Sequence, residues 1–90
     1  MREVVSSTAF RKDVKRADKR GKDMAKLRAV IVLLIEDAPL KPKHRDHPLK
    51  GEWQGWRDLH VEPDWVLIYK VTETELLLAR TGTHSDLFGE

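Results

Sequence analysis

The stretch Trp65-Val66-Leu67-Ile68-Tyr69-Lys70-Val71 decides the fold of this chain, because its β-branched and aromatic residues favour a β-strand. Residues 72–75 predict a tight reversal, and residues 76–83 then predict an antiparallel partner strand. Before the central stretch, Glu62-Pro63-Asp64 predicts a turn, and residues 53–61, which follow a glycine at position 51, predict a further strand. Three consecutive strands therefore occupy the second half of the chain.

The first half of the chain predicts one short strand and two helices. Residues 2–6 predict the strand, and Ser7 or Thr8 can cap a helix that continues to about Arg20. Asp23 can cap a second helix, which ends before the first proline of the chain because residues preceding proline avoid helical dihedrals.

The predicted order of elements is β-α-α-β-β-β, with residues 39–50 and their three prolines as a loop. We therefore expect an α+β fold in which two helices pack on one face of an antiparallel sheet. Strand alternation assigns one set of residues to the helix side: Leu59, Val61, Val66, Ile68, Leu77 and Ala79. It assigns a second set to the other face or its rim: Asp58, His60, Trp65, Leu67, Tyr69, Arg80 and His84.

Length and composition indicate one domain spanning residues 1–90, since domains of about 100 residues are common. The absence of cysteine excludes disulfides and thiolate zinc sites. The longest apolar run, Ala29 to Ile35, is too short to cross a bilayer, and no signal peptide is visible. We expect a cytoplasmic protein without a membrane partner.

Charge is unevenly distributed along the chain. Residues 1–50 carry 14 Lys and Arg against 7 Asp and Glu, whereas residues 51–90 carry 3 against 8. This asymmetry is typical of a basic surface that binds a polyanion such as nucleic acid, although solvation of the helices would explain it equally well.

Arg80-Thr81-Gly82-Thr83-His84 places an arginine and a histidine on one strand face, provided that the strand extends that far. Metal-independent RNA cleavage needs a general base, a general acid and a cation for the phosphate, and imidazole can serve either proton role near neutral pH. The candidate catalytic residues are His47, His60, Asp64, His84 and Arg80.

Each candidate also has a purely structural explanation. Arg80 could form an ion pair with Glu62 or Asp58, and the histidines could be ordinary loop or strand residues. His44 is expected to be a solvated loop residue. His44 and His47 offer only two metal ligands in one loop, so we expect neither a metal nor a cofactor.

Longer motifs carry a resemblance to a known family. They are His47-Pro48-Leu49-x-Gly51-x-Trp53-x-Gly55-x-Arg57-Asp58-x-His60-Val61-x-Pro63-Asp64-Trp65, the segment from Arg80 to His84, Leu87-Phe88-Gly89, Lys12-Asp13-Val14-Lys15 and Lys22-Asp23-Met24. In these positions the chain resembles the RelE superfamily of bacterial toxins, and more closely the YafQ-type ribosome-dependent mRNA interferases. The resemblance covers nearly the whole chain.

The resemblance implies a RelE-like, microbial-ribonuclease-like fold and a type II toxin that cleaves mRNA in the ribosomal A site. It implies catalytic roles for His47, His60, Asp64 and His84, with Arg80 stabilising the phosphate. Trp65 and Phe88 would shape the site or position the mRNA. Basic residues would bind 16S ribosomal RNA: Lys12, Lys15, Arg16, Lys19, Arg20, Lys22, Lys41, Lys43, Arg45 and Lys50.

The implied partners are the ribosome with its mRNA and a cognate antitoxin, in a complex that could be a heterotetramer. Operator DNA would be bound only through the antitoxin. Two other functions remain open at this point: a non-catalytic translation inhibitor that binds RNA or the ribosome, and a metal-dependent hydrolase. A binding module has no need of histidines beside the arginine, and this favours the nuclease.

Overall fold

The computed structural model describes residues 2–89; Met1 and Glu90, the ends of the expected domain, lie outside the described residues. The elements in chain order are β1 (Glu3–Ser6), α1 (Thr8–Lys19), α2 (Met24–Ile35), η1 (Pro42–His44), β2 (His47–Pro48), η2 (Gly51–Trp53), β3 (Arg57–Glu62), β4 (Trp65–Val71), β5 (Glu75–Gly82) and α3 (His84–Phe88), with η1 and η2 being short 3₁₀ turns.

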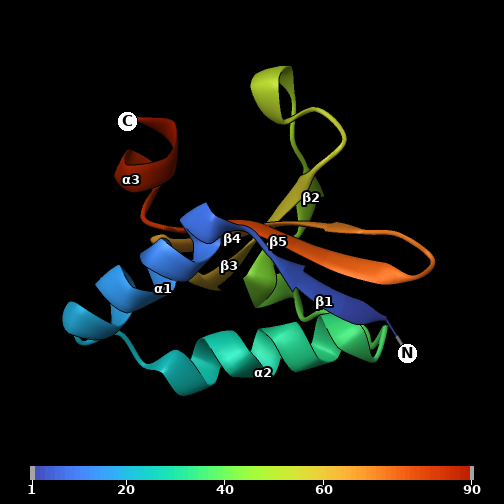
Figure 1. The fold of residues 1–90 in the computed structure, drawn as a ribbon, viewed down its shortest axis with the longest axis horizontal. Helices are drawn as coiled ribbons and strands as arrows, with labels where there is room; N and C mark the ends of the chain where they lie inside the picture. Colours follow the sequence, from blue (N-terminus) through green and yellow to red (C-terminus); the bar gives the residue numbers. More distant parts are fainter. Residues whose placement is uncertain (1, 90) are drawn as a thin grey trace.

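One five-stranded sheet has the order β1-β5-β4-β3-β2 (Figure 1). The strands β2 to β5 pair antiparallel, whereas β1 runs parallel to β5. The predicted α+β fold is confirmed, but the expectation of a wholly antiparallel sheet is wrong at the β1 edge. No hairpin joins β1 to β5, so no turn dictates their relative direction.

Both helices begin where their capping residues predict. Ser7 Oγ accepts a hydrogen bond of 2.9 Å from the Phe10 N–H, and Asp23 Oδ1 accepts one of 3.1 Å from the Ala25 N–H. Gly21, which has a φ of 82°, follows α1 in the left-handed region that glycine adopts without strain. None of the helices among residues 2–89 is long and apolar enough to cross a membrane.

The two long helices pack on the same face of the sheet, as predicted, with α2 running along that face in Figure 1. Each fully buried Leu, Val or Phe side chain contributes about 1.5–3 kcal/mol through loss of apolar contact with water. The buried core on this side consists of Phe10, Ala17, Leu27, Val30, Leu34, Leu59, Trp65, Leu67, Tyr69, Leu76 and Leu78.

The predicted orientation of β4 is wrong. Trp65, Leu67 and Tyr69 face the helices, whereas Val66 and Ile68 belong to a smaller cluster on the opposite face. Because β4 is apolar on both faces, alternation alone could not decide which face meets the helices.

A bulge in β5 makes the predicted orientation of this strand wrong at Leu77 and Ala79. Tyr69 pairs with Leu78 while Ile68 pairs with Arg80, so Ala79 is an extra residue in the ladder. The bulge changes the phase of alternation, and Ala79 joins the cluster on the face away from the helices. Leu76 and Leu78 contribute to the helix-side core, where Leu77 had been expected.

Two further segments differ from expectation. The strand predicted from Trp53 begins only at Arg57, and β2 lies within the predicted loop of residues 39–50. A third helix, α3, follows β5, where a short tail was expected. Thr83 and Asp86 form a reciprocal capping box at its start. In Figure 1, α3 and the loop that continues from β2 lie on the side of the sheet opposite α2.

Candidate active site

Four residues form one row across the sheet on the face away from the helices. Arg80 pairs with Ile68, Ile68 with Asp58, and Asp58 with His47, on strands β5, β4, β3 and β2 respectively. Directly paired residues in a sheet present their side chains on the same face. His60 follows Asp58 by two positions and shares this face, so the tertiary structure brings together three of the predicted catalytic residues.

His84 reaches the site from α3 rather than from a strand. The strand ends at Gly82, so the condition under which His84 would continue the alternation of Arg80 is not met. The start of α3 instead places its ring beside His60, with ring centroids 5.2 Å apart. Phe88, one helical turn later, has its ring centroid 6.2 Å from that of His84.

Asp64, in the turn between β3 and β4, holds His84. Its Oδ1 accepts a 3.0 Å hydrogen bond from the His84 backbone N–H and lies 2.7 Å from Nδ1 of the same residue. These two bonds, the backbone one first, hold the pKa of Asp64 below its usual range. An ionised Asp64 fixes Nδ1 as the protonated nitrogen, which directs Nε2 away from the carboxylate.

Asp58 is a site residue that the sequence analysis missed. Its side chain is only 4% exposed, and Oδ1 lies 3.0 Å from His47 Nδ1. That nitrogen is also 2.8 Å from the Arg45 carbonyl, and Oδ1 has no assigned hydrogen bond among residues 2–89. The short distance from His47 Nδ1 to Asp58 and the lack of a hydrogen bond to Asp58 Oδ1 among the described residues agree if Nδ1 donates its proton to the Arg45 carbonyl. One N–H cannot fully satisfy both the carbonyl and the carboxylate.

Burial raises the pKa of Asp58, while the neighbouring imidazoles of His47, His60 and His84 act in the opposite direction. Asp58 is therefore the buried carboxylate around which the three predicted catalytic histidines gather. Its position two residues before His60 on an alternating strand was the signal available in the sequence.

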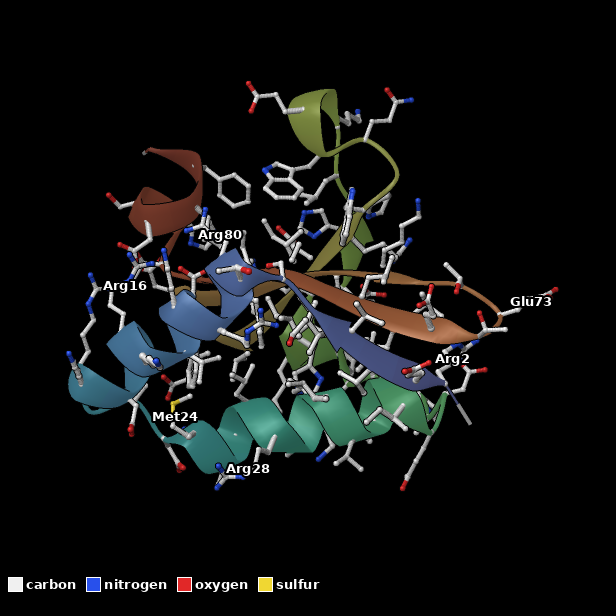
Figure 2. The ribbon with its side chains drawn as sticks, in the orientation of Figure 1. Arg2, Arg16, Met24, Arg28, Glu73 and Arg80 are labelled. Carbon is white, nitrogen blue, oxygen red and sulfur yellow. The ribbon has the colours of Figure 1, made fainter. Side chains whose placement is uncertain are left out.

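Arg80 is paired, but not with Glu62 or Asp58. Its Nε lies 2.6 Å from Oδ2 of Asp13 and its Nη2 lies 3.1 Å from Oδ1, an ion pair that raises the pKa of Arg80. Asp13 belongs to α1 and is 67 positions away in sequence, which no local pattern could reveal. Figure 2 shows Arg80 on the same side of the molecule as Arg16, near α1 and α3.

The segment before His47 is fixed by Asp46. Arg57 donates to both Asp46 oxygens at 3.2 and 3.1 Å, and the Tyr69 hydroxyl donates to Oδ1. His44 is buried, which lowers its pKa, and its Nδ1 accepts a hydrogen bond from the Lys41 N–H. The expectation that His44 is solvated is therefore wrong, because the η1 turn folds its ring inward.

Trp65 does not lie on the sheet face that carries the histidines. It is 1% exposed in the helix-side core, and its Nε1 donates a 2.9 Å hydrogen bond to Thr81 Oγ1. A side chain with so little exposed surface cannot itself contact mRNA in this conformation, and the other suggested role of Trp65, shaping the site, stays a prediction. Phe88 is half-buried beside His84, on the face that carries the histidines.

A family model described as "Bacterial toxin of type II toxin-antitoxin system, YafQ" matches residues 2–89. The chain belongs to the YafQ toxin family. It is 54% identical over 89 residues to "mRNA interferase toxin YafQ" of Escherichia coli strain K12, an alignment covering 98% of this chain and 97% of that protein.

Solved structures agree with the family membership. The crystal structure of YafQ from E. coli strain BL21(DE3) superposes with a TM-score of 0.94 at 52% identity, covering 99% of this chain and all of that one. The toxin in the E. coli DinJ-YafQ toxin–antitoxin complex superposes with a TM-score of 0.91 at 54% identity over 98% of both chains. These comparisons confirm the predicted RelE-like fold and the prediction of a toxin enzyme, an endoribonuclease.

The basic residues of this YafQ family member divide into two groups. Three of those predicted to bind ribosomal RNA already have acidic partners: Arg20 lies 2.7 Å and Arg16 3.9 Å from Asp86, and Lys22 lies 3.8 Å from Glu62. Among residues 2–89, the other seven are exposed and form no ion pair: Lys12, Lys15, Lys19, Lys41, Lys43, Arg45 and Lys50.

The described part of the chain, residues 2–89, holds no group of three His, Cys, Asp or Glu side chains arranged for a metal ion. A cavity of about 580 Å³ opens between α2, η1 and β4 and is lined by residues such as Leu34, Pro42 and Tyr69. None of the five predicted catalytic side chains lines this cavity. The candidate active site is therefore identified by its cluster of titratable side chains and not by this cavity.

Proposed function

We propose that this YafQ family toxin cleaves mRNA in the ribosomal A site, without a metal, by acid–base attack of the ribose 2′-hydroxyl on the adjacent phosphate, and so inhibits translation. The observation that carries this proposal is the arrangement of the three histidines on the sheet face of Arg80. His47 and Asp58 lie in the same cross-strand row as Arg80, and His60, two positions after Asp58, has its ring centroid 5.2 Å from that of His84. This arrangement supplies a base, an acid and a cation within one site.

His84 serves as the general acid for the departing 5′-oxygen. Because Nδ1 donates to Asp64, the nitrogen available for proton transfer is Nε2. Arg80 stabilises the negative charge that develops on the phosphate oxygens. Phe88, beside His84, offers an aromatic surface on which a base of the mRNA can stack.

The general base is then one of the two remaining histidines. Asp64 is occupied by two bonds to His84, which makes it an orienting residue instead. His47 is held by the donation of its Nδ1–H to the Arg45 carbonyl, and this leaves its Nε2 for the 2′-hydroxyl. His60 lies closer to His84 and can supply the same function.

The partners follow from charge and family. The seven unpaired basic residues bind 16S ribosomal RNA, and the single domain of residues 1–90 acts in the cytoplasm, where ribosomes are. The E. coli relative is found in a complex with DinJ, and we propose that a cognate antitoxin binds this chain, in a complex that could be a heterotetramer. Operator DNA is bound only through that antitoxin.

The experiment that tests the proposal is primer-extension mapping of mRNA in a translating extract, with the native chain and His84→Ala. We expect cuts within codons that require translation and that disappear with the variant. Asp18→Asn, an exposed change on α1 that touches none of the catalytic groups, is the control and should cut normally.

Two results would contradict the proposal. Arrest of translation without cuts, equal in both proteins, would indicate a non-catalytic inhibitor that binds the ribosome. Loss of all cuts on addition of a chelator, at a magnesium level that keeps ribosomes intact, with recovery on adding zinc, would indicate a metal-dependent hydrolase.

A further inference from the structure

The carboxylate of Asp13 is the most highly hydrogen-bonded acidic group outside the histidine cluster. It is 5% exposed, on the inner side of α1, and it receives four hydrogen bonds from three residues. Arg80 supplies two of them, Arg16 Nη2 a third at 2.9 Å, and the Thr81 backbone N–H a fourth at 3.1 Å. We infer that Asp13 is a positioning residue that sets the orientation of the Arg80 guanidinium toward the scissile phosphate. The inference rests on the proposed function of Arg80.

The geometry of the guanidinium group supports a specific orientation. Asp13 binds the edge formed by Nε and Nη2, which is one of the two edges that can engage a carboxylate or a phosphate bidentately. The edge formed by Nη1 and Nη2 is left, and Nη1 has no hydrogen-bond partner among residues 2–89. Asp13 therefore holds the Nε–Nη2 edge of the Arg80 guanidinium and leaves the Nη1–Nη2 edge free to bind a phosphate.

Asp13 also has a structural task that must be separated from positioning. The strand β1 pairs with β5 only as far as Leu78, so the Thr81 N–H lies beyond its end. Asp13 accepts from this N–H and thereby replaces the missing strand. Loss of this bond would lower stability whether or not Arg80 needed to be oriented, so activity alone cannot test the inference.

The hydrogen bonds of Asp13 connect helix α1, whose exposed side is the proposed surface for ribosomal RNA, to the candidate active site. The helix α1 presents Lys12, Lys15 and Lys19 to solvent while its inner side holds Arg80 through Asp13. A carboxylate on α1 therefore fixes the cation of the active site relative to the surface that would bind ribosomal RNA. Such rigid support matters because a misplacement of about 1 Å can cost about a hundredfold in rate.

The first test is a double-mutant cycle on single-turnover cleavage, using ribosomes programmed with an A-site codon and saturating amounts of Asp13→Asn, Arg80→Ala and the double variant. We expect Asp13→Asn to slow cleavage by about tenfold to a hundredfold, with unchanged ribosome affinity, and the double variant to be no slower than Arg80→Ala. Asp18→Asn is the matched control, since it removes a charge from the exposed side of the same helix.

Chemical rescue is a second readout that a structural role would not change. Added guanidinium ion should bind the carboxylate vacated in Arg80→Ala and restore part of its rate. It should fail to do so in the double variant, which lacks the carboxylate. Equal rescue of both proteins would overturn the inference.

A spectroscopic measurement follows the side chain independently of cleavage. The Nε–H resonance of Arg80 should be protected from exchange in the native protein and in Asp18→Asn, and should lose that protection in Asp13→Asn. If Asp13→Asn fails to fold, Asp13→Glu keeps the charge but moves the carboxylate outward, and it should show the same slow cleavage.

The outcomes separate the inference from the proposed function. Slow cleavage by Arg80→Ala beside native cleavage by Asp13→Asn overturns the role of Asp13 alone. If the losses of cleavage rate in Asp13→Asn and Arg80→Ala add strictly in the double variant, the inference is also overturned. Asp13 would then act on the stability of the protein and not through Arg80. Native cleavage by Arg80→Ala removes Arg80 from the proposed mechanism and overturns the inference with it.

Discussion

Asp64 holds His84 at two points, through the backbone N–H at 3.0 Å and through Nδ1 at 2.7 Å. The two residues are 20 positions apart, and the contact joins the β3–β4 turn to the start of α3. It fixes both the helix and the tautomer of its first side chain, which is the residue we propose as the general acid.

Replacing Asp64 with asparagine should slow cleavage while leaving the fold intact. The amide oxygen can still accept from the His84 N–H, but the negative charge beside the His84 ring is lost. We expect a fall of about tenfold to a hundredfold in the single-turnover rate. Because His84 lowers the pKa of Asp64, the carboxylate is ionised well below neutrality, so the deficit should persist from about pH 5 to 8. A variant that recovered native rates within this range would contradict the pairing, and Asp64→Asn should add nothing to His84→Ala.

Asp58→Asn should make the protein more stable and less active. Burial raises the pKa of Asp58, so the folded state holds the proton more tightly than the unfolded chain, and ionisation above the ordinary carboxyl pKa costs stability. Removing the ionisable group should raise the melting temperature at pH 8 by about 4 °C or more, which corresponds to about 1 kcal/mol. Cleavage should slow because the three histidines lose their shared carboxylate. Thermal unfolding at pH 8 measures the first effect, and a lower melting temperature would contradict it.

Asp86→Asn should weaken the attachment of α3 in a pH-dependent way. Arg20 donates to Asp86 at 2.7 Å and, with the Thr83 N–H, holds the pKa of this carboxyl far below its usual range. A lowered carboxyl pKa contributes stability above the unfolded pKa of about 4, and that contribution is lost as pH falls through the folded pKa. We expect the variant to be about 1 kcal/mol less stable at pH 7, with the difference shrinking below about pH 4. Urea unfolding at several pH values checks this, and a difference independent of pH would refute it.

Trp65→Phe and Phe88→Ala should separate core packing from substrate contact. Trp65 is buried and bonded to Thr81, so its replacement should cost about 1–3 kcal/mol of stability and leave cleavage by the folded protein nearly native. Phe88 is half-buried beside His84, so its removal should slow cleavage and cost less stability. Melting curves and single-turnover rates on the same samples decide between the two effects. Normal stability with slow cleavage in Trp65→Phe would instead assign Trp65 the other suggested role, shaping the site.

The unpaired lysines of α1 should control ribosome binding. Changing Lys12, Lys15 and Lys19 together to glutamine should weaken ribosome association and make it less dependent on salt. The slope of log affinity against log salt should fall by about two to three. Arg16→Gln with Arg20→Gln is the matched comparison, because these side chains bond to Asp13 and Asp86 and should chiefly affect stability. Equal salt slopes for the native chain and the lysine variant would count against the basic surface.

Local patterns predicted much of the fold. Ser7 and Asp23 predicted the starts of the two long helices, because caps and helical periodicity depend on neighbours within one or two turns. Residues 65–71 formed the strand that their composition predicts. The Thr83–Asp86 capping box before Leu87 is a sequence signal for α3. It was missed because the strand-like residues before it led us to extend the predicted strand to Thr83.

The site was predicted in part. The face carrying Asp58, His60 and Arg80 was assigned correctly from strand alternation, while the apolar residues of β4 were placed on the wrong side of the sheet. The chemical residue types were visible in the sequence, and so was their family resemblance. Their contacts were not, because Asp13 meets Arg80 across 67 positions and Asp64 meets His84 across 20.

The sequence by itself determined the order of the two long helices and of strands β1, β3, β4 and β5, the residues at which those helices begin, and the set of side chains capable of acid–base chemistry. Each of these depends on residue type and short-range spacing. Only the tertiary structure decided that β1 pairs parallel with β5, that the bulge at Ala79 turns β5, and that Asp58 is buried among three histidines. These features arise when distant strands pack and exclude water, and the burial that raises the pKa of Asp58 exists only once that packing is complete.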